Sequence, residues 1–270
     1  MDKKKYLDLV ESQNKYSKTE IISFIIIALI VLLSLVGVDP MDIPENGAKT
    51  AKSIISGIFH PAADLIFSLS PQSVLYLLVE TIAIAFLGTI FGAIFSIIPA
   101  FLGSNNISPT IVTKITRILL SIIRTVPAVI YGLMFISVTG PGPFAGVMTF
   151  SITSIGMITK LYIESIEDID EGVIEALKAS GASKLQTIRL GVIPQLTGSF
   201  LSTAIYRFEI NVKDASILGL VGAGGLGTPL ILAMAEQRWE DVGAYLLGLI
   251  LLVLIVEFYS TKIRTKLVRG

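Results

Sequence analysis

Six long hydrophobic runs, separated by polar segments, dominate the pattern of this chain. Each is long enough to cross a bilayer as a helix, for which roughly 20 mostly apolar residues are needed. The runs occupy residues 21–38, 73–98, 117–138, 144–163, 198–221 and 243–261. Residues 99–116 are expected to form a polar connection, and the GPGP sequence at 140–143 a tight turn. We therefore expect an all-α, polytopic membrane helix bundle with about six transmembrane helices.

The first run follows a lysine-rich start and has two interpretations. A basic segment before an apolar run is the arrangement of a secretory signal peptide. No small-x-small cleavage site follows residues 21–38, and the run is longer than the apolar region of most signal peptides. A retained first helix is therefore the favoured interpretation.

Residues 39–72 differ from the runs on either side because they carry several acids, lysines and prolines. Within them, Ile54, Ile55, Ile58 and Phe59 recur at helical spacing. This pattern predicts a partly amphipathic external segment, for which two placements fit equally well. The segment lies on the membrane surface, or it packs as a helix over the bundle.

Composition narrows the class of protein. Hydrophobic residues make up 53% of the chain and charged residues 16%, which is typical of a multi-span membrane protein. The formal net charge is zero, so no nucleic-acid partner is expected. The chain has no cysteine, which excludes disulfides, thiol catalysis and cysteine-ligated metals. Its one histidine, His60, cannot build a histidine metal site alone.

The distribution of basic residues predicts the orientation of the helices. Most lysines and arginines lie in the two termini, the 99–116 connection and the 165–196 loop, whereas acids predominate in the opposite loops. Because cytoplasmic loops carry the excess of basic residues, we expect both termini and the 165–196 loop to face the cytoplasm. Residues 1–20 are then a cytoplasmic N-terminal segment, and 21–270 a single transmembrane domain in the cell membrane.

The polar stretch after the fourth run has the pattern of two short capped helices. Asp170 suits the cap of the first, and Ser183 with Gln186 fits a capping box for the second. Gly181 lies between them, where a helix would end and turn. Pro194 is expected to stop the second helix, because proline lacks an amide donor and clashes with the preceding turn.

This stretch resembles the cytoplasmic EAA loop of the permease subunits of bacterial ABC importers. That loop reads Glu-Ala-Ala, three residues, Gly and, some nine residues later, Ile-x-Leu-Pro. Glu175, Ala176, Gly181 and Pro194 match it at the same spacing. The departures are Leu177 for the second alanine, Gly191 for the isoleucine and Ile193 for the leucine.

Three further segments resemble the permeases of phosphonate importers. They are GPGPFAG at 140–146, GVIPQ at 191–195 and YRFEINVKDASILGLVGAGGLG at 206–227. The resemblance covers the C-terminal half of the chain well and the first seventy residues less. It implies a bundle like that of type I ABC importer permeases, which forms the pathway for phosphonate-type organic anions delivered by an extracytoplasmic solute-binding protein.

The resemblance also implies the other partners. In the family, the loop docks as a coupling helix in a groove of an ATP-binding subunit, present in two copies beside a second permease copy in the membrane lipid. Gly181 would let the turn lie close to that subunit, and Glu175 would offer it a carboxylate. Ile174 and Leu177 would pack in the partner's groove or against the permease itself. The candidate coupling residues are Glu175, Ala176, Leu177, Gly181 and Pro194.

The fifth run is rich in ionisable residues, which are costly in lipid and are expected to pair or to line a wet cavity. Arg207 shares a helix face with Asn211, and Glu209 shares another with Lys213. For Glu209 and Lys213, mutual neutralisation and a role in the pathway are equally good interpretations. Arg207 is the better pathway candidate, because its planar fork matches the oxygens of an anionic substrate.

Arg124 in the third run is the other pathway candidate. It begins the sequence Arg-Thr-Val-Pro, which also resembles the family. Many relatives carry glutamate after that proline, where this chain has Ala128, and this difference weakens any polar role at the position.

Gly222, Gly224 and Gly227 spell G-x-G-x-x-G, a pattern also found in dinucleotide-binding folds. The context argues against that fold, because a membrane span precedes the glycines and no βαβ unit surrounds them. We expect these glycines, with Gly225, to form a flexible external turn or gate whose backbone packs closely and whose amides could contact an anion.

No G-x-x-x-x-G-K-[ST] loop occurs in the chain. ATP hydrolysis is therefore expected on a separate subunit, and this chain is expected to catalyse no reaction and to hold neither cofactor nor metal. Alternatives to a phosphonate permease are a permease for another small solute, such as methionine or a phosphate-like anion, a stand-alone secondary transporter, and a membrane-anchored scaffold. A homodimer is expected, although the sequence does not exclude a heterodimer.

Overall fold

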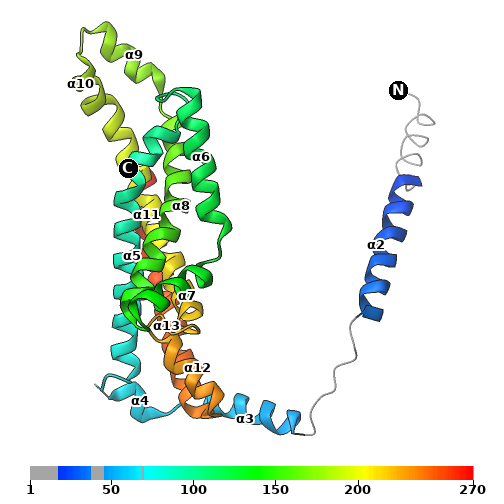
Figure 1. Ribbon diagram of the computed structural model, residues 1–270. Helices are drawn as coiled ribbons and strands as arrows, with labels where there is room; N and C mark the ends of the chain where they lie inside the picture. The colour runs from blue at the N-terminus through cyan, green and yellow to red at the C-terminus, as the bar shows by residue number, and fades with distance from the viewer. Residues whose placement is uncertain (1–17, 38–45, 69, 270) are drawn as a thin grey trace, which may run out of the picture. The chain divides into compact units, whose positions relative to one another are not determined.

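The computed structural model describes residues 18–37, 46–68 and 70–269. Every regular element in this part of the chain is a helix, which confirms the predicted all-α class (Figure 1). The helices are α2 (Lys18–Gly37), α3 (Gly47–Phe59), α4 (Ala63–Phe67), α5 (Val74–Gly103), α6 (Thr110–Thr125), α7 (Ala128–Thr139), α8 (Pro143–Glu167), α9 (Glu171–Ala179), α10 (Lys184–Thr187), the π-helical turn η1 (Ile188–Val192), α11 (Ile193–Gly219), α12 (Gly227–Ala235) and α13 (Trp239–Arg269).

The chain divides into two units, Met1–Thr50 and Ala51–Gly270, which are described separately. In the first unit, the predicted run 21–38 forms α2 as far as Gly37, and its large apolar side chains are exposed. A helix that is apolar on every side suits a lipid environment. Most of the predicted N-terminal segment, residues 1–17, lies outside the described residues.

Among the described residues, four helices are long and apolar enough to cross a membrane. They lie within α2, α5, α8 and α13 and coincide with four of the six predicted runs. The bent pair of α6 and α7 forms a fifth span if it is counted as one. The remaining run, 198–221, corresponds to α11, which carries several ionisable residues and is not among these candidates. It nevertheless packs against α5, α8 and α13.

The close contact between α5 and α8 forms the centre of the second unit. Gly88 lies against Phe150, and Gly92 against Ser154, so closely that a Cβ on either glycine would overlap the Cβ opposite. Small residues four apart allow helix backbones to approach in lipid. Gly88 and Gly92 therefore serve helix packing here.

Replacing Gly92 with leucine should disrupt the α5–α8 contact. Even a Cβ at this position meets the Cβ of Ser154, and it lies 3.1 Å from the carbonyl oxygen of Ser151. Overpacking of this kind should lower the melting temperature by about 5–10 °C in detergent. Gly37→Leu is the control, because nothing lies within 4 Å of a Cβ there. Equal melting of the two variants would contradict this packing.

The third predicted run is not one straight helix. α6 ends at Thr125, α7 begins at Ala128, and the two are bent by 81°. Pro127 explains the break, because it lacks an amide donor and disfavours a helical backbone for the residue before it. Val126 accordingly has an extended backbone, with φ −85° and ψ 120°. The prediction of a span over 117–138 therefore holds only if the bent pair is counted as one broken span.

The connection predicted at 99–116 is also shorter than expected. α5 continues to Gly103 with Pro99 inside it, and α6 begins at Thr110, so only residues 104–109 lie between the helices. Proline is tolerated within transmembrane helices where neighbouring groups satisfy the freed carbonyls. Pro99 therefore does not mark the end of this helix.

The predicted external segment 39–72 contains α3 and α4, with residues 38–45 and 69 outside the described part. Gly57 of α3 is buried against Trp239 and Gly243 at the start of α13, with no room for a Cβ on Gly57 or on Gly243. For residues 51–59, this contact favours a helix packed over the bundle rather than one lying free on the surface.

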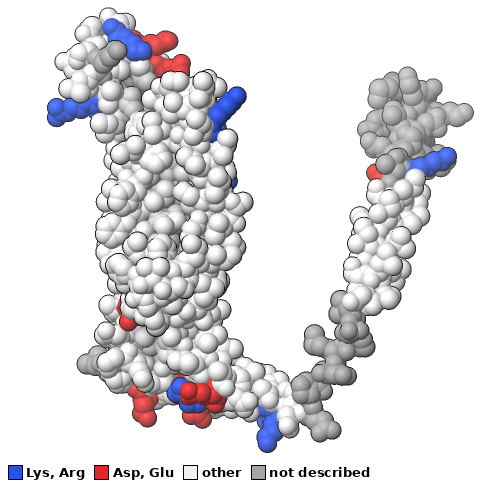
Figure 2. All heavy atoms as spheres, viewed as in Figure 1, with Lys and Arg blue, Asp and Glu red and all other residues white. Residues whose placement is uncertain are grey.

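The two ends of the second unit differ from its middle. α9 and α10 project from one end, and α4 and α12 lie at the other (Figure 1). On the face shown in Figure 2, the charged side chains gather mostly at these ends and leave an uncharged band between them. Such a band is expected where a bundle crosses the hydrocarbon core of a membrane.

Candidate functional site

The first part of the 165–196 loop folds as its capping residues predict. Asp170 Oδ1 accepts a hydrogen bond from the Gly172 amide at 2.8 Å, which caps α9. The Ser183 amide donates to Gln186 Oε1 at 2.8 Å, and the Gln186 amide donates to Ser183 Oγ at 3.4 Å, so the capping box is present. Gly181 turns the chain between the two helices with φ +79°.

Pro194 does not end the second helix, contrary to the prediction. α10 continues through η1 into α11, so residues 184–219 form one helical segment. In η1 the chain widens to a π-helical turn, in which the Ile193 amide donates to the Ile188 carbonyl. Pro194 then lies in the first turn of α11, where its missing amide donor costs least.

Two of the departures from the EAA pattern compensate each other. A Cβ on Gly191 would lie 2.8 Å from Leu177 Cδ1, so the leucine side chain covers the glycine. The usual pattern has a small alanine at the first position and a large isoleucine at the second. This chain has the large residue at the first position and the small residue at the second, and it keeps the contact between α9 and η1. Leu177 therefore packs against the permease itself.

The outer surface of this loop carries exposed apolar side chains beside exposed Glu175 and Ala176. Leu185 is 77% exposed and Leu190 61% exposed, and Ile188 is also exposed. Contiguous apolar side chains on an exposed surface are typical of a site that binds another protein. Because the loop projects from the end of the bundle (Figure 1), these side chains are available to such a partner.

Gln195 connects this loop to the bundle by hydrogen bonds, a role that its place in the sequence does not reveal. Its Oε1 accepts a hydrogen bond from the Asp170 amide at 2.9 Å, and its Nε2 donates to the Gly191 carbonyl at 2.9 Å. The start of α9 is thereby connected to the start of α11. Movement of α9 is expected to be passed to α11 through this side chain.

Arg207 lies deep in the bundle and contacts α8. Its Nε donates to Ser154 Oγ at 3.0 Å, and its Nη2 donates to Thr153 Oγ1 at 3.1 Å. Its Nη1 lies 3.2 Å from Met157 Sδ, a weak acceptor. Asn211 joins the cluster as its shared helix face predicts, because its Nδ2 also donates to Ser154 Oγ at 3.0 Å.

In this cluster the positively charged guanidinium of Arg207 is hydrogen-bonded only to neutral side chains among the described residues. Arg207 is 7% exposed, and none of the described carboxylates forms an ion pair with it within 4.0 Å. A buried charge is costly unless it is paired or hydrogen-bonded. In Asn211 of the same cluster, the buried Oδ1 has no hydrogen-bond partner. The arrangement leaves the guanidinium able to attract an anion.

Glu209 and Lys213 form the ion pair that their spacing predicts, at 3.0 Å. α13 adds two partners that could not be inferred from spacing. Lys213 Nζ also lies 3.0 Å from Glu257 Oε2, and Arg264 Nη2 lies 3.1 Å from Glu209 Oε2. The four charges sum to zero and join α11 to α13. This geometry favours neutralisation as the role of Glu209 and Lys213.

Replacing Glu209 with glutamine should destabilise the bundle. Its carboxylate is 6% exposed and holds both Lys213 and Arg264, so its loss leaves two cations underpaired. Breaking a buried ion pair costs about 3 kcal/mol, which should lower the melting temperature by about 5–10 °C. Glu164→Gln is a matched control, because the Lys160–Glu164 pair is exposed and should contribute little. Equal effects would contradict this view of the network.

Arg124 lies apart from Arg207. It lines a cavity of about 180 Å³ between α6 and α8, together with the Arg117–Glu167 and Lys160–Glu164 ion pairs. Its side-chain stem packs on Gly156, where a Cβ would lie 2.8 Å from Arg124 Cγ. Arg207 contacts other residues of α8, so the structure does not bring the two arginines together within one chain.

The predicted glycine turn is closely packed. Gly222, Gly224 and Gly225 have positive φ values of +88°, +83° and +72°. The Gly225 amide donates to Glu80 Oε1 at 2.7 Å. Gly227 lies against α11, where a Cβ would overlap the carbonyl oxygen of Ser216. The turn is therefore fixed to both α5 and α11.

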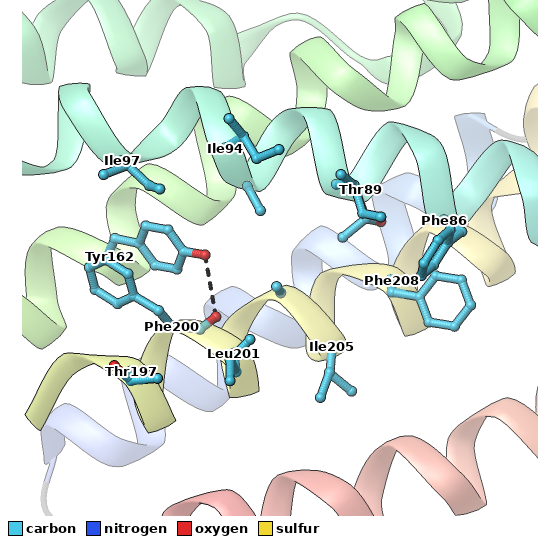
Figure 3. A pocket seen from close by; sticks show the side chains of 13 residues that line it. Phe86, Thr89, Ile94, Ile97, Tyr162, Thr197, Phe200, Leu201, Ile205 and Phe208 are labelled. Atoms are coloured by element: carbon cyan, nitrogen blue, oxygen red, sulfur yellow. Dashed lines mark hydrogen bonds between the residues drawn. The ribbon is translucent and has the colours of Figure 1, made fainter. Parts of the chain in front are cut away.

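A groove of about 500 Å³ lies between α5 and α11 in the second unit. In Figure 3, Phe86 and Phe208 lie at one end, while Tyr162 and Phe200 stack at the other with ring centroids 3.7 Å apart. None of the described residues that line this groove is charged. The groove therefore offers an anion no cationic partner, and none of the predicted site residues is among its lining residues.

Residues that support the site come from helices that the sequence analysis did not connect. Ser154 and Thr153 of α8 hold Arg207, Glu257 and Arg264 of α13 complete the charge network, and Glu80 of α5 holds the glycine turn. Glu80 and Glu257 were recognisable, each as a carboxylate within an apolar run.

The chain matches the family described as binding-protein-dependent transport system inner membrane component over residues 92–264. It is 36% identical over 188 residues to the phosphite transport system permease protein PtxC of Stutzerimonas stutzeri, which covers 69% of this chain and 68% of the relative. It is 33% identical over 190 residues to the phosphate-import permease protein PhnE of Mycolicibacterium smegmatis, which covers 70% of this chain but only 36% of that relative.

The fold is similar to a solved structure of the inward-facing MetNI methionine ABC transporter. The TM-score is 0.62 with 20% identity, and the match covers 72% of this chain and 95% of the other. At this identity the likeness shows the fold alone, and it confirms a bundle of the ABC importer permease kind. By sequence and by fold, the chain belongs to the family of binding-protein-dependent transport system inner membrane components.

Proposed function

We propose that this chain is the permease subunit of an ATP-driven importer for phosphonate-type anions. The relatives named for phosphite and phosphate transport support an anion that carries phosphorus and oxygen. The observation that carries the proposal is Arg207, a buried guanidinium held only by neutral groups among the described residues. Its fork matches the oxygens of such an anion.

ATP hydrolysis belongs to a separate subunit in this proposal. The chain has no phosphate-binding loop of the G-x-x-x-x-G-K-[ST] type. The exposed apolar residues around Gly181 form the surface that an ATP-binding subunit would contact. Two permease copies and two ATP-binding subunits make up the importer.

The continuous helical segment 184–219 supports a lever mechanism. It connects the loop around Gly181 with Arg207, and its far end leads into the glycine turn. When the ATP-binding subunits close, they draw the α9–α10 loops of the two permease copies together. The movement reaches α11 through Gln195 and η1, and it changes the side of the membrane to which Arg207 is accessible.

The orientation follows from the basic residues of the loops. The α9–α10 end faces the cytoplasm, and the end with α4 and α12 faces outward, where a solute-binding protein docks on residues 222–241 and on the neighbouring α3. The substrate then passes Arg207 of each copy and Arg124 at the α6–α8 cavity. Weak contacts suit passage, because capture belongs to the binding protein.

Permeases for phosphite and phosphate are the alternatives with support, because their substrates share the oxyanion chemistry of phosphonates. A stand-alone secondary transporter would explain the charges of α11 but not the exposed apolar loop around Gly181. A secondary transporter would work without an ATP-binding subunit, whereas an importer permease requires one.

Gentle solubilisation of native membranes tests the proposal. We expect a stoichiometric ATP-binding subunit to purify with this chain and to be released when the α9–α10 surface is altered. Transport by the chain alone, with no such subunit attached, would contradict the proposal and favour a secondary transporter.

A further inference from the structure

A carboxylate from α5 occupies the glycine turn. Glu80 Oε1 accepts a hydrogen bond from the Gly225 amide at 2.7 Å. The same oxygen lies over Gly224, where a Cβ would be 3.1 Å away. Both glycines have positive φ values and no side chain, so the carboxylate can approach the backbone closely. Successive amides in turns of this kind form concavities that bind anions.

The turn and Glu80 line a cavity of about 360 Å³. Its walls come from the start of α5, the Gly-Pro turn at 141–143 and the α11–α12 connection. This volume is within the range of small-molecule sites. Among the described residues, no lysine or arginine lines the cavity. Its lining includes the Gly225 amide, which Glu80 occupies, and Gln72, whose side-chain amide is a further donor, whereas the Thr228 hydroxyl already donates to the Gly219 carbonyl at 3.1 Å.

We propose that the glycine turn is an oxyanion site at the outer mouth of the permease, which Glu80 occupies until a transported phosphonate, phosphite or phosphate displaces its carboxylate. The placement at the outer mouth rests on the proposed function. Carboxylates and these oxyanions accept the same short, charge-assisted hydrogen bonds from amides.

The arrangement keeps the Gly225 amide satisfied when no substrate is present. An unpaired buried donor is costly, and Glu80 removes this cost in the empty site. Because Glu80 is half-buried and lines the cavity, its carboxylate can turn away from Gly225 without unfolding the helix. Displacement would also remove one of the two hydrogen bonds by which α5 holds the turn, the other being from the Leu226 amide to Thr81, which links arrival of the anion to loosening at this end of the bundle.

Phosphite binding to the purified full chain in nanodiscs tests the proposal by calorimetry. Glu80→Gln removes the competing charge, and Glu80→Ala removes the competing group. Both variants should bind phosphite at least tenfold more tightly than the unaltered chain. Unchanged or weaker binding in the two variants would overturn the proposal.

Thr81→Val is the matched control. Thr81 Oγ1 accepts a hydrogen bond from the adjacent Leu226 amide at 2.9 Å, so its loss loosens the same turn without removing a charge. Phosphite affinity should not change in this variant. An equal gain in Thr81→Val would mean that loosening the turn, rather than removing Glu80, exposes the site, and it would also overturn the proposal.

A second measurement needs no variant. Gly224-Gly225 is the one Gly-Gly pair in the sequence, so labelling glycine with ¹³C at the carbonyl and ¹⁵N at the amide selects the Gly225 amide in a carbonyl–amide correlation spectrum. Phosphite should shift this resonance, whereas chloride at equal ionic strength should not. An unmoved resonance at saturating phosphite would contradict the proposal. Neither measurement uses ATP or a partner, so failure here is distinguishable from failure of the importer assignment.

Discussion

Replacing Arg207 with alanine should lower ATP-driven uptake of phosphite about 10–100-fold, which corresponds to the loss of about 1.5–3 kcal/mol from hydrogen bonds to a charged group. The guanidinium is buried, its three hydrogen-bond partners are neutral, and no described carboxylate forms an ion pair with it within 4.0 Å, although the charge of Asp214 acts on it from a greater distance. Arg207→Lys should recover part of the rate, because it keeps the charge but loses the planar fork.

Initial uptake rates in proteoliposomes that contain the assembled importer check this result. Lys266→Ala is the control, because Lys266 is an exposed cation near the end of α13 and should not affect uptake. Circular dichroism should show equal helix content in all variants. Unchanged uptake in Arg207→Ala would exclude Arg207 from the pathway and limit it to holding α11 against α8.

Replacing Gly181 with leucine should uncouple the permease from its ATP-binding subunit. The φ of +79° is strained for a residue with a side chain, at a cost of about 1–2 kcal/mol. No atom of the described residues lies within 4 Å of a Cβ at this position, so the added side chain would extend from the surface that we assign to the partner. We expect at least a tenfold loss of subunit association and of uptake.

Ser180→Ala is the matched control for Gly181→Leu. Ser180 lies in the same turn with an ordinary φ of −77°, and its hydroxyl bonds only within α9, to the Ala176 carbonyl at 2.8 Å. Association of the ATP-binding subunit, measured by co-purification, should be unaffected. Full association with the leucine variant would show that the turn does not approach a partner.

Features set by nearby residues were predictable from the sequence. The caps at Asp170 and Ser183, the turn at Gly181 and the Glu209–Lys213 pair all depend on groups within four positions. The close approach of α5 through its Gly88 and Gly92 pair follows equally from composition and spacing.

The effect of each proline depended on its surroundings. Pro127 breaks a predicted helix by 81°, whereas Pro99 lies inside α5 and Pro194 in the first turn of α11. The difference depends on whether neighbouring groups or a π turn accommodate the missing hydrogen bond, which one segment of sequence does not reveal.

Contacts between segments far apart in the chain could likewise not be predicted from the sequence. Glu80 meets Gly225 across 145 positions, and Arg264 meets Glu209 across 55. A single sequence identifies such ionisable residues as costly in a membrane, but their partners depend on how the helices pack. Leu177 over Gly191 is a similar case, in which two departures from a pattern prove to be one contact.

ATP-driven uptake tests the central claim most directly. The chain, its co-purified ATP-binding subunit and the solute-binding protein would be reconstituted in proteoliposomes with radiolabelled phosphite or methylphosphonate. We predict uptake that requires both ATP and the binding protein, and that stops when either is omitted. Uptake that proceeds without ATP, with the chain as the sole protein, would contradict the account.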